Sequence, residues 1–599
     1  MNEVIIERIS KLRALMAEKG MDAYIIPSAD NHQSEYVGEH FKARAYMTGF
    51  SGSAGTAVVT KGKAGLWTDG RYFLQAELQL EGRGIELFRM GNPVVSTVPE
   101  FLEAEIPKDG KLGFDGRLIG LQEGEDYIKK LSHKNVTVEY AFDLVDMVWE
   151  NRPNISAEPV FLLAEKYSGE SRASKLERVR DVMKGSGASH HVLTTLDDTA
   201  WLLNIRGNDV MYSPLVLCYA VVEMDKVCLF IEESKLDSDV KDALAKDGVE
   251  LKAYNEIYEY VKGFNADDTI MIDPVRINYS LFKNIPAQTK KVEKENPTIL
   301  FKAMKNPVEL VNIEHAHIKD GVAFTKLMYW LKTNIGKTKI TEISAAEKLE
   351  EFRKQQEGYL WQSFAPICAF KEHAAIVHYE ATPESDVELS EGYFVLMDTG
   401  GNYYEGSTDI TRTLALGEVS QELKHHFTTV ARGMMNLARA KFLYGCKGYN
   451  LDILAREPFW SLDMDFKHGT GHGVGYLLNI HEGPAGFRWN IMPGRNEVHN
   501  LEEGMVITDE PGIYIAGSHG IRTENELIVR KGIENEFGQF MYFDVATFAP
   551  IDLDAIDAED LNRDEKLYLN SYHKLVYGKI SGHLSDDERE WLKNYTREI

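Results

Sequence analysis

A pattern of apolar residues that repeats along the chain most constrains its fold. Residues 9–25 recur as residues 176–192, an offset of 167 positions. Each copy is typical of an amphipathic helix, a glycine that ends the helix, and a buried strand. The matching pairs are Ile9 and Leu176, Leu12 and Val179, Leu15 and Val182, Met16 and Met183, Gly20 and Gly187, and Ile25 and Val192. The repeat predicts two similar α/β domains in tandem.

The length of the chain requires further structure beyond these two domains, because 599 residues are too many for one hydrophobic core. Two polar stretches that contain proline, ENRPNISAEP and KENPTILFKAMKNP, are typical of domain boundaries. We therefore expect a protein of the α/β (α+β) class with domains at 1–155, 156–300 and 301–599. The first two domains carry no reactive cluster of side chains, which favours a scaffolding role.

The composition indicates a globular intracellular protein, with 44% hydrophobic residues and four cysteines that form no CxxC pair. Acidic residues exceed basic ones by 26 (93 against 67), which argues against a nucleic-acid or anionic-membrane partner. No apolar run approaches the ~20 residues that cross a bilayer. We expect a cytoplasmic protein with neither nucleic acid nor membrane as a partner.

Two runs with glycine look like phosphate loops but lack residues that such loops need. GFSGSAGTAVV at 49–59 contains no GK[ST] and no GxGxxG that opens a helix. The GKT at 336–338 is preceded by Leu331, where the loop needs its first glycine. We interpret 49–59 as a tight turn that leads into a strand.

The third domain is predicted to be rich in helices around a strand pair. The proline at the start of residues 306–332, with acids early and lysines late, favours a long helix there. The remaining predicted elements are a helix at 341–357, a strand pair at about 392–414, a helix at 418–443, and two helices within 558–599.

Two aspartates in this strand pair are the first candidate metal ligands. If the hairpin folds symmetrically about Tyr403 and Tyr404, Asp398 and Asp409 face each other. Two such carboxylates would repel, and a cation between them removes that cost. The triplet Asp398-Thr399-Gly400 also matches aspartic proteases, but that chemistry needs a second such triplet, which the chain lacks.

A second acidic pair, Glu510 and Glu524, lies on two successive strand-like segments, MVITDE and IRTENELIVR. A strand that runs out and another that returns bring both carboxylates to one place. Arg522 shares a strand face with Glu524, because side chains two residues apart point the same way. It could neutralise the acids, hold a substrate carbonyl, or form a plain salt bridge.

Histidines lie between the two acidic pairs, in HGTGHGVGYLLNIHEGP. His468 and His472 have the i, i+4 spacing of a helical metal pair, but the glycines disfavour a helix and HExxH is absent. Glycines instead permit close approach of backbone and substrate. His481 follows nine residues later, and His378 is a further candidate at the end of an apolar strand.

Four carboxylates and one histidine form a hard, oxygen-rich ligand set. It favours Mn²⁺ or a similar divalent ion over a thiolate-type zinc site. More anions converge than one ion needs, which indicates two metals ~3.5–4 Å apart with carboxylate bridges. Two such ions produce hydroxide near neutral pH and polarise a carbonyl. The predicted chemistry is metal-assisted hydrolysis.

The order of these motifs resembles the metallopeptidases of pita-bread fold, and within them the long, three-domain cytosolic type of the aminopeptidase P (Xaa-Pro aminopeptidase) family. The resemblance covers the whole chain and implies two creatinase-like domains followed by a pita-bread catalytic domain. It implies removal of the first residue from peptides with proline second, through attack by a hydroxide that bridges two metals, most often Mn²⁺, with Co²⁺ or Zn²⁺ as alternatives. A homodimer is also a family expectation.

The resemblance assigns a role to each candidate residue. Asp398 and Asp409 would bind one metal and His472 and Glu510 the other, with Asp409 and Glu524 as bridging ligands. Glu510 would also orient the hydroxide and carry its proton to the proline nitrogen. The other candidates would hold the scissile carbonyl and stabilise the oxyanion: His378, His468, His481 and Arg522.

Two positions differ from the family pattern without touching a proposed ligand. Glu380 stands where a small apolar residue is expected, and the segment 487–501 is longer than in animal members. We expect these two differences to affect which peptides are preferred, and not the chemistry of the site. Three other functions remain as alternatives to an Xaa-Pro aminopeptidase: a prolidase that acts on Xaa-Pro dipeptides, a methionine aminopeptidase, and a non-enzymatic pita-bread binding module.

Overall fold

The computed structural model describes residues 2–491 and 498–599. The long segment 487–501 is therefore described only in part, because 492–497 lie outside these residues. The chain divides into two compact units. The first comprises residues up to 163 together with 170–298, and the second comprises Ala164–Gly169 with Ile299–Ile599.

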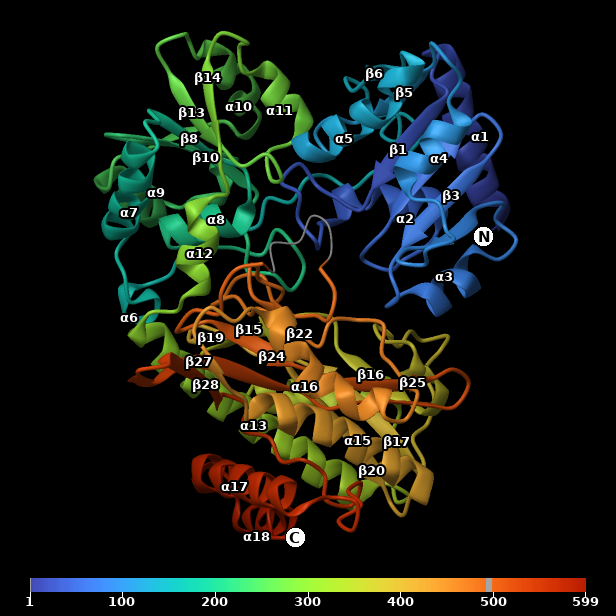
Figure 1. Ribbon diagram of the computed structural model, residues 1–599, viewed down its shortest axis with the longest axis vertical. Coiled ribbons are helices and arrows are strands. Elements are labelled where there is room, and N and C mark those ends of the chain that lie inside the picture. Colours follow the sequence, from blue (N-terminus) through green and yellow to red (C-terminus); the bar gives the residue numbers. More distant parts are fainter. Residues whose placement is uncertain (1, 492–497) are drawn as a thin grey trace. The chain divides into compact units, whose positions relative to one another are not determined.

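The first unit contains two six-stranded sheets with equivalent strand orders (Figure 1). In each sheet the central strand pairs antiparallel on one side and parallel on the other. The first sheet has the order β4 (Glu86–Arg89), β3 (Ala64–Thr68), β2 (Thr56–Thr60), β1 (Ala23–Pro27), β5 (Lys111–Phe114) and β6 (Thr137–Glu139). The second has the order β12 (Val249–Lys252), β11 (Val227–Ile231), β10 (Cys218–Glu223), β8 (His190–Leu193), β13 (Thr269–Ile272) and β14 (Lys290–Glu293).

The predicted duplication is confirmed at the level of single residues. Helix α1 (Asn2–Glu18) leads to β1, and helix α7 (Arg172–Gly185) leads to β8. Gly20 and Gly187 end these helices in the left-handed conformation, with φ of 69° and 68°. Glycine adopts this conformation without the steric cost that a Cβ brings. The repeated apolar side chains are buried on the same face in both copies, except that Leu15 and Val182 are only partly buried.

Short helices complete the two α/β domains of the first unit. The glycine run at 49–59 forms a turn before β2, as predicted. The helices of the first domain after α1 are α2 (Ala43–Thr48), α3 (Phe73–Leu80), α4 (Val98–Glu105) and α5 (Leu121–Leu131). Those of the second domain after α7 are α8 (Leu196–Leu203), α9 (Ser238–Lys246), α10 (Ile257–Tyr260) and α11 (Tyr279–Asn284).

The second unit packs long helices around several small antiparallel sheets (Figure 1). Its main helices are α13 (Pro307–Asn334), α14 (Glu342–Arg353), α15 (Gln421–Ala438), α16 (Gly448–Trp460), α17 (Arg563–Ile580) and α18 (Asp586–Tyr595). One sheet comprises β16 (Ile367–Phe370), β17 (Tyr393–Thr399) and β20 (Ile410–Leu416). Another comprises β21 (Lys441–Leu443), β28 (Gly538–Val545), β27 (Asn525–Asn535) and β24 (Val506–Asp509). The smaller sheets pair β15 (Tyr359–Gln362), β18 (Gly401–Tyr403) and β19 (Gly406–Ser407), then β22 (Gly471–His472) with β23 (Gly486–Phe487), and β25 (Gly512–Ile515) with β26 (His519–Arg522).

Helix α13 begins as its sequence predicts. Asn306 caps the helix, since its side chain accepts from the backbone N–H groups of Val308 and Glu309. The Glu309 carboxylate accepts in return from the backbone N–H of Asn306 at 2.9 Å, which completes a capping box. Pro307 occupies the first helical position, where its missing N–H costs nothing.

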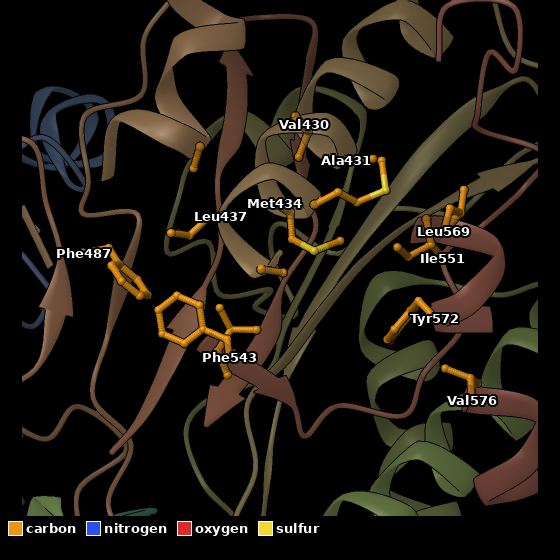
Figure 2. Close-up of a cluster of buried hydrophobic side chains, with 14 of the residues drawn as sticks. Val430, Ala431, Met434, Leu437, Phe487, Phe543, Ile551, Leu569, Tyr572 and Val576 are labelled. Carbon is orange, nitrogen blue, oxygen red and sulfur yellow. The ribbon is translucent and has the colours of Figure 1, made fainter. Parts of the chain in front are cut away.

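The core of the second unit packs helices α15 and α17 against the sheet that contains β24, β27 and β28. Figure 2 shows Met434 and Leu437 of α15, Phe543 of β28, and Leu569 and Tyr572 of α17 in one cluster of buried side chains. Burial of such side chains stabilises the fold by about 1.5–3 kcal/mol each. None of the helices in the described part of the chain is long and apolar enough to cross a membrane.

The predicted hairpin at 392–414 is present, but its register differs from the prediction. Asp398 pairs with Thr411, and Tyr403 pairs with Gly406. The hairpin therefore turns around Tyr404 and Glu405, one residue later than predicted. The partner of Asp398 is therefore Thr411, two residues after the predicted partner Asp409. Since side chains two residues apart on a strand point to the same face, Asp398 and Asp409 still share a face as diagonal neighbours.

The prediction that His378 ends an apolar strand is wrong. The preceding residues form a 3₁₀ helix, η6 (Lys371–Ala375), and His378 lies in the turn that follows it. Alanines and isoleucine in a short apolar run do not distinguish a strand from a tight helix by periodicity alone.

Candidate metal centre

Two adjacent strands bring the second acidic pair together. Strand β24 pairs with β27 so that Asp509 faces Asn525, and β25 pairs with β26 so that Gly512 faces Arg522. Both pairings continue one register, in which Glu510 stands opposite Glu524. The two glutamates lie between these paired segments, outside the regular strand pairing.

Glycines allow His472 to approach these strands closely. A Cβ on Gly471 would lie 1.8 Å from the carbonyl oxygen of Thr508, and one on Gly473 would lie 2.1 Å from that of Glu482. A larger residue would push the backbone away from β24 at Gly471 and away from Glu482 at Gly473. The His472 N–H donates to Thr508 Oγ1 at 3.0 Å, which fixes this approach. The segment is not a helix, as the glycines predicted; residues Gly471–His472 form the short strand β22.

Three of the five predicted ligands converge within the reach of one ion. Donor atoms of Asp409, His472 and Glu524 all lie within 4.8 Å of one another. The His472 Nε2 is 3.5 Å from Asp409 Oδ2 and 3.7 Å from Glu510 Oε1. Its Nδ1 lies 3.0 Å from the carbonyl oxygen of Gly473, which can only accept. Nδ1 therefore carries the hydrogen, and Nε2 directs its lone pair at the carboxylates.

The carboxylates of the cluster are held close together at an electrostatic cost. Burial raises the pKa of Glu510 to about 8, with a further contribution from Asp398 that Arg522 opposes. Burial and the charge of Glu524 raise the pKa of Asp409 well above its usual value. Burial and the charge of Glu510 do the same for the pKa of Glu524. Several like charges of this kind can ionise together only with a nearby cation.

The two carboxylate oxygens of Asp398 have different surroundings. Its Oδ2 accepts from Arg522 Nε at 3.2 Å and from Nη2 at 2.5 Å. Its Oδ1 is buried without a hydrogen-bond partner among the described residues. A buried oxygen without a partner costs about 1–3 kcal/mol, which a cation would offset.

His468 reaches the acidic cluster through a tyrosine. Its Nδ1 lies 2.7 Å from the carbonyl oxygen of Gly469, so this nitrogen carries the hydrogen. Burial, with Arg522 nearby, lowers the pKa of His468 to about 3, which keeps the ring neutral. Its Nε2 therefore accepts from the Tyr514 hydroxyl at 2.9 Å. The Tyr514 oxygen accepts in turn from Arg522 Nη1 at 2.7 Å, and Arg522 donates to Asp398.

The two remaining histidines lie at the edges of this group. The ring of His481 packs edge-on against His472, with centroids 4.2 Å apart. His378 follows Val377, whose carbonyl oxygen accepts from Arg522 Nη2 at 3.4 Å. His378 and His481 are both partly exposed, which leaves them accessible to a peptide.

Several residues that were not candidates from the sequence support the ligands. Glu526 Oε1 accepts from the Asp409 N–H at 2.7 Å, and Thr411 Oγ1 donates to Glu524 Oε2 at 2.8 Å. Tyr514 links His468 to Arg522, as described above. Tyr514 could have been found from the register of the β25–β26 hairpin, which places it diagonally across from Arg522 on one face. Glu526 gives no local signal, because its role depends on how β20 packs beside β27.

The donor set fits a pair of divalent cations. It offers carboxylate oxygens, the Nε2 of one imidazole, and a buried aspartate oxygen without a hydrogen-bond partner among the described residues. Oxygen-rich sets of this kind bind Mn²⁺ and similar ions, and one imidazole is compatible with them. The fold and these donors define a hydrolytic metalloenzyme of the peptidase type.

Comparisons with known proteins identify the class. The Creatinase/Prolidase N-terminal domain matches residues 8–148 and again 151–309. Metallopeptidase family M24 matches residues 311–531, and the C-terminal region of peptidase M24 matches 539–599. The expected fold class is confirmed: two creatinase-like α/β domains precede a pita-bread catalytic domain.

Individual relatives extend over the whole chain. Aminopeptidase P2 of Arabidopsis thaliana is 38% identical, over 100% of this chain and 89% of its own length. Xaa-Pro aminopeptidase 1 of Dictyostelium discoideum is 37% identical, over 99% and 97%. X-prolyl aminopeptidase of Caenorhabditis elegans, described as a cytosolic enzyme with a di-nuclear active site, has 33% identity and a TM-score of 0.95, over 99% and 100%. The chain belongs to the aminopeptidase P family of M24 metallopeptidases.

Proposed function

We propose that the protein is a metal-dependent aminopeptidase that removes the first residue from peptides with proline in the second position. The observation that carries the proposal is the convergence of Asp409, His472 and Glu524 within 4.8 Å, next to Glu510 and Asp398. Relatives that match along the whole chain bear the name aminopeptidase P or Xaa-Pro aminopeptidase.

Five side chains would hold two divalent cations. In this assignment Asp409 and Glu524 would be the ligands shared by the two ions, as the family resemblance implies, and their donor atoms lie within 4.8 Å of each other and of His472. Asp398 completes one site, and His472 with Glu510 completes the other. The bound cations supply an activated water and polarise the scissile carbonyl.

Glu510 is the group that moves a proton. Burial raises the pKa of its carboxyl, which makes the carboxylate a better proton acceptor than an exposed glutamate, whereas bound cations would lower that pKa again. Glu510 takes the proton of the attacking water and delivers it to the nitrogen of the leaving proline. That nitrogen belongs to a tertiary amide without an N–H, so it leaves as an amine only after it gains a proton.

The histidines divide into two roles. His378 and His481, both partly exposed, donate to the oxyanion that forms as the carbonyl is attacked. Both ring nitrogens of His468 are already engaged, one by Gly469 and one by Tyr514. His468 therefore acts through Tyr514, which orients Arg522 against Asp398.

Peptide length separates this activity from that of a prolidase. Both enzymes break the bond before proline, but a prolidase acts on Xaa-Pro dipeptides. We expect the protein to hydrolyse Xaa-Pro-Yaa tripeptides and to act poorly on the matching Xaa-Pro dipeptides, as measured by release of the first residue. Cleavage of the dipeptides alone would favour the prolidase, and cleavage of neither by a metal-loaded protein would favour a binding module.

Three finer features complete the proposal. Mn²⁺ is the expected ion because the donor set is rich in oxygen, with Co²⁺ and Zn²⁺ as substitutes. A cytoplasmic location agrees with the description of the Caenorhabditis elegans relative as cytosolic. A homodimer is expected from the family, and exposed Ile533 and Phe537 on the β27–β28 hairpin offer apolar surface for it. Light scattering at several protein concentrations tests the dimer.

A further inference from the structure

A buried arginine on helix α16 contacts the segment that carries His468. Residues 461–470 have irregular structure, so regular helix or strand pairing does not supply donors to their carbonyl groups. Arg456 donates from Nη1 to the carbonyl oxygen of Phe466 at 3.0 Å and from Nη2 to that of His468 at 3.4 Å. A guanidinium has five N–H donors in one plane, which suits it to hold several such groups at once.

Two aspartates and an aromatic ring hold this arginine in one orientation. Asp452, one turn earlier on α16, accepts from Arg456 Nε at 2.8 Å and from Nη2 at 3.4 Å. Asp465 accepts from Nη1 at 2.7 Å. The Arg456 Cζ also lies 3.9 Å from the centroid of the Phe466 ring. Arg456 and Asp452 are both fully buried, so salt and solvent screen their attraction little.

Thr470 connects this ion pair to the metal centre. Its hydroxyl donates to Asp452 Oδ1 at 2.5 Å and accepts from Arg456 Nη2 at 3.2 Å. Its carbonyl oxygen accepts from the backbone N–H of Glu510 at 2.7 Å. Thr470 is itself fully buried, so its side chain and its backbone form one continuous path from α16 to Glu510.

We propose that Arg456 and Asp452 position the metal centre by fixing Thr470. The inference rests on the function proposed above for this centre. His472 follows Thr470 by two residues, and Glu510 is bonded to the Thr470 carbonyl oxygen. A displacement of Thr470 therefore moves two proposed ligands together. Displacements of about 1 Å in such groups can lower a rate about 100-fold.

Stability alone is a weak reason for a buried ion pair at this place. The cost of taking two charges out of water offsets most of their attraction, and apolar side chains of similar size often stabilise a fold as well. Apolar side chains could not donate to the carbonyl oxygens of Phe466 and His468, or accept from the Thr470 hydroxyl. The contacts with this segment are thus what the ion pair adds.

Thr429 on α15 offers a matched control. It is buried like Thr470, with 1% of its surface exposed. Its hydroxyl donates to the carbonyl oxygen of His425, one turn earlier on the same helix, at 2.9 Å. Valine at either position removes one buried hydroxyl and keeps the branched shape. Only at position 470 does the loss reach the proposed ligands.

The test compares Thr470→Val, Thr470→Ser and Thr429→Val in the full-length protein. We expect Thr470→Val to bind Mn²⁺ at least about tenfold more weakly in a calorimeter, and its kcat on an Xaa-Pro-Yaa peptide to fall at least about tenfold with a smaller change in KM. Thr470→Ser keeps the hydroxyl and should restore both values. Thr429→Val should match wild type in both.

Equal Mn²⁺ affinity of Thr470→Val and wild type would overturn the inference, as would an equal loss in Thr470→Ser or Thr429→Val. Wild-type protein that binds Mn²⁺ without cleaving the peptide would contradict the proposed function instead, and the affinities would still decide the inference. Melting temperatures show whether Thr470→Val folds. If it does not, Arg456→Lys carries the test, because its single ammonium group keeps the charge but cannot make all the contacts of the guanidinium.

Discussion

Arg522 holds Asp398 by one carboxylate oxygen and leaves the other facing the site. Both Nε and Nη2 of Arg522 donate to Oδ2, whereas Oδ1 is buried and makes no hydrogen bond with the described residues. The arginine thus neutralises part of the acidic cluster and fixes the direction of the remaining oxygen. Tyr514 holds the arginine itself in place, at 2.7 Å.

This arrangement predicts the effect of removing one hydroxyl. Tyr514→Phe keeps the ring but loses both the donor to His468 and the acceptor for Arg522. We expect kcat to fall about 10- to 100-fold, as for other groups that orient metal ligands, with a smaller change in KM. Steady-state kinetics on an Xaa-Pro-Yaa peptide measure this. Tyr542→Phe, at a half-exposed position on β28, serves as the control and should retain full activity.

The raised pKa values of the carboxylates predict how the metal-free protein responds to pH. Glu510 keeps its proton up to about pH 8 in the folded chain, whereas an unperturbed glutamate loses it near pH 4.5. Between these values the folded state binds more protons than the unfolded state. The free energy of unfolding of the chelated protein should therefore fall as pH rises from about 4.5 to about 8.

Metal binding should follow the opposite trend. Cations displace protons from Glu510 and its neighbours, so affinity for Mn²⁺ should increase with pH up to about pH 8. Calorimetry in buffers of different ionisation enthalpy counts the protons released. An affinity that does not change between pH 6 and 8, with no proton release, would contradict this account of the site.

A buried ion pair behind the first hairpin predicts a large loss of stability. Asp320 on α13 accepts from Arg353 Nε at 2.6 Å and from Thr408 Oγ1 at 2.7 Å. Arg353 also donates to Thr399 Oγ1 at 3.0 Å. The pair therefore fixes the neighbours of both site aspartates, since Thr399 follows Asp398 and Thr408 precedes Asp409.

Asp320→Ala should lower the free energy of unfolding of the catalytic unit by about 3–5 kcal/mol, because it leaves the Arg353 charge buried and unpaired. Urea unfolding followed by tryptophan fluorescence measures this loss. Glu351→Ala removes an ion pair with Lys348 in which Glu351 is mostly exposed, and it should cost at most about 1 kcal/mol. Equal losses in the two variants would show that the buried pair has no special role.

Arg412 connects helix α17 to Glu524, one of the proposed metal ligands. It is fully buried and donates to the carbonyl oxygens of Glu524 and Pro550 and to the hydroxyl of Tyr572 on α17. A lysine has a single ammonium group and cannot make all these contacts. We expect Arg412→Lys to weaken Mn²⁺ binding about 10- to 100-fold, as measured by calorimetry. Arg432→Lys, on α15 and partly exposed, should bind the ion normally.

The fold followed from local patterns in the sequence wherever those patterns are periodic. The repeat at Ile9 and Leu176 predicted the duplicated domains because both helices bury the same face. Pro307, with acids early and lysines late in the segment, predicted the start of α13. His378 was misplaced because an apolar run of a few residues has no distinctive period.

The site was predictable where ligands follow each other along strands, and less so where they meet across the fold. Glu510 and Glu524 face each other through a register that continues on both sides of them. The hairpin of Asp398 was placed two residues out of register, because a Tyr-Tyr-Glu turn gives no clear centre. Support from Glu526 and Arg412 depends on tertiary packing, which no local pattern encodes.

Metal-dependent hydrolysis before proline is the central claim, and one experiment tests it most directly. The protein is chelated, its metal content is measured by mass spectrometry, and hydrolysis of an Xaa-Pro-Yaa peptide is followed as Mn²⁺ is returned. We predict two ions per chain at full activity, none in the inactive chelated protein, and no recovery for Glu510→Gln. Hydrolysis by metal-free wild-type protein, or none by wild-type protein that holds two ions, would contradict the claim.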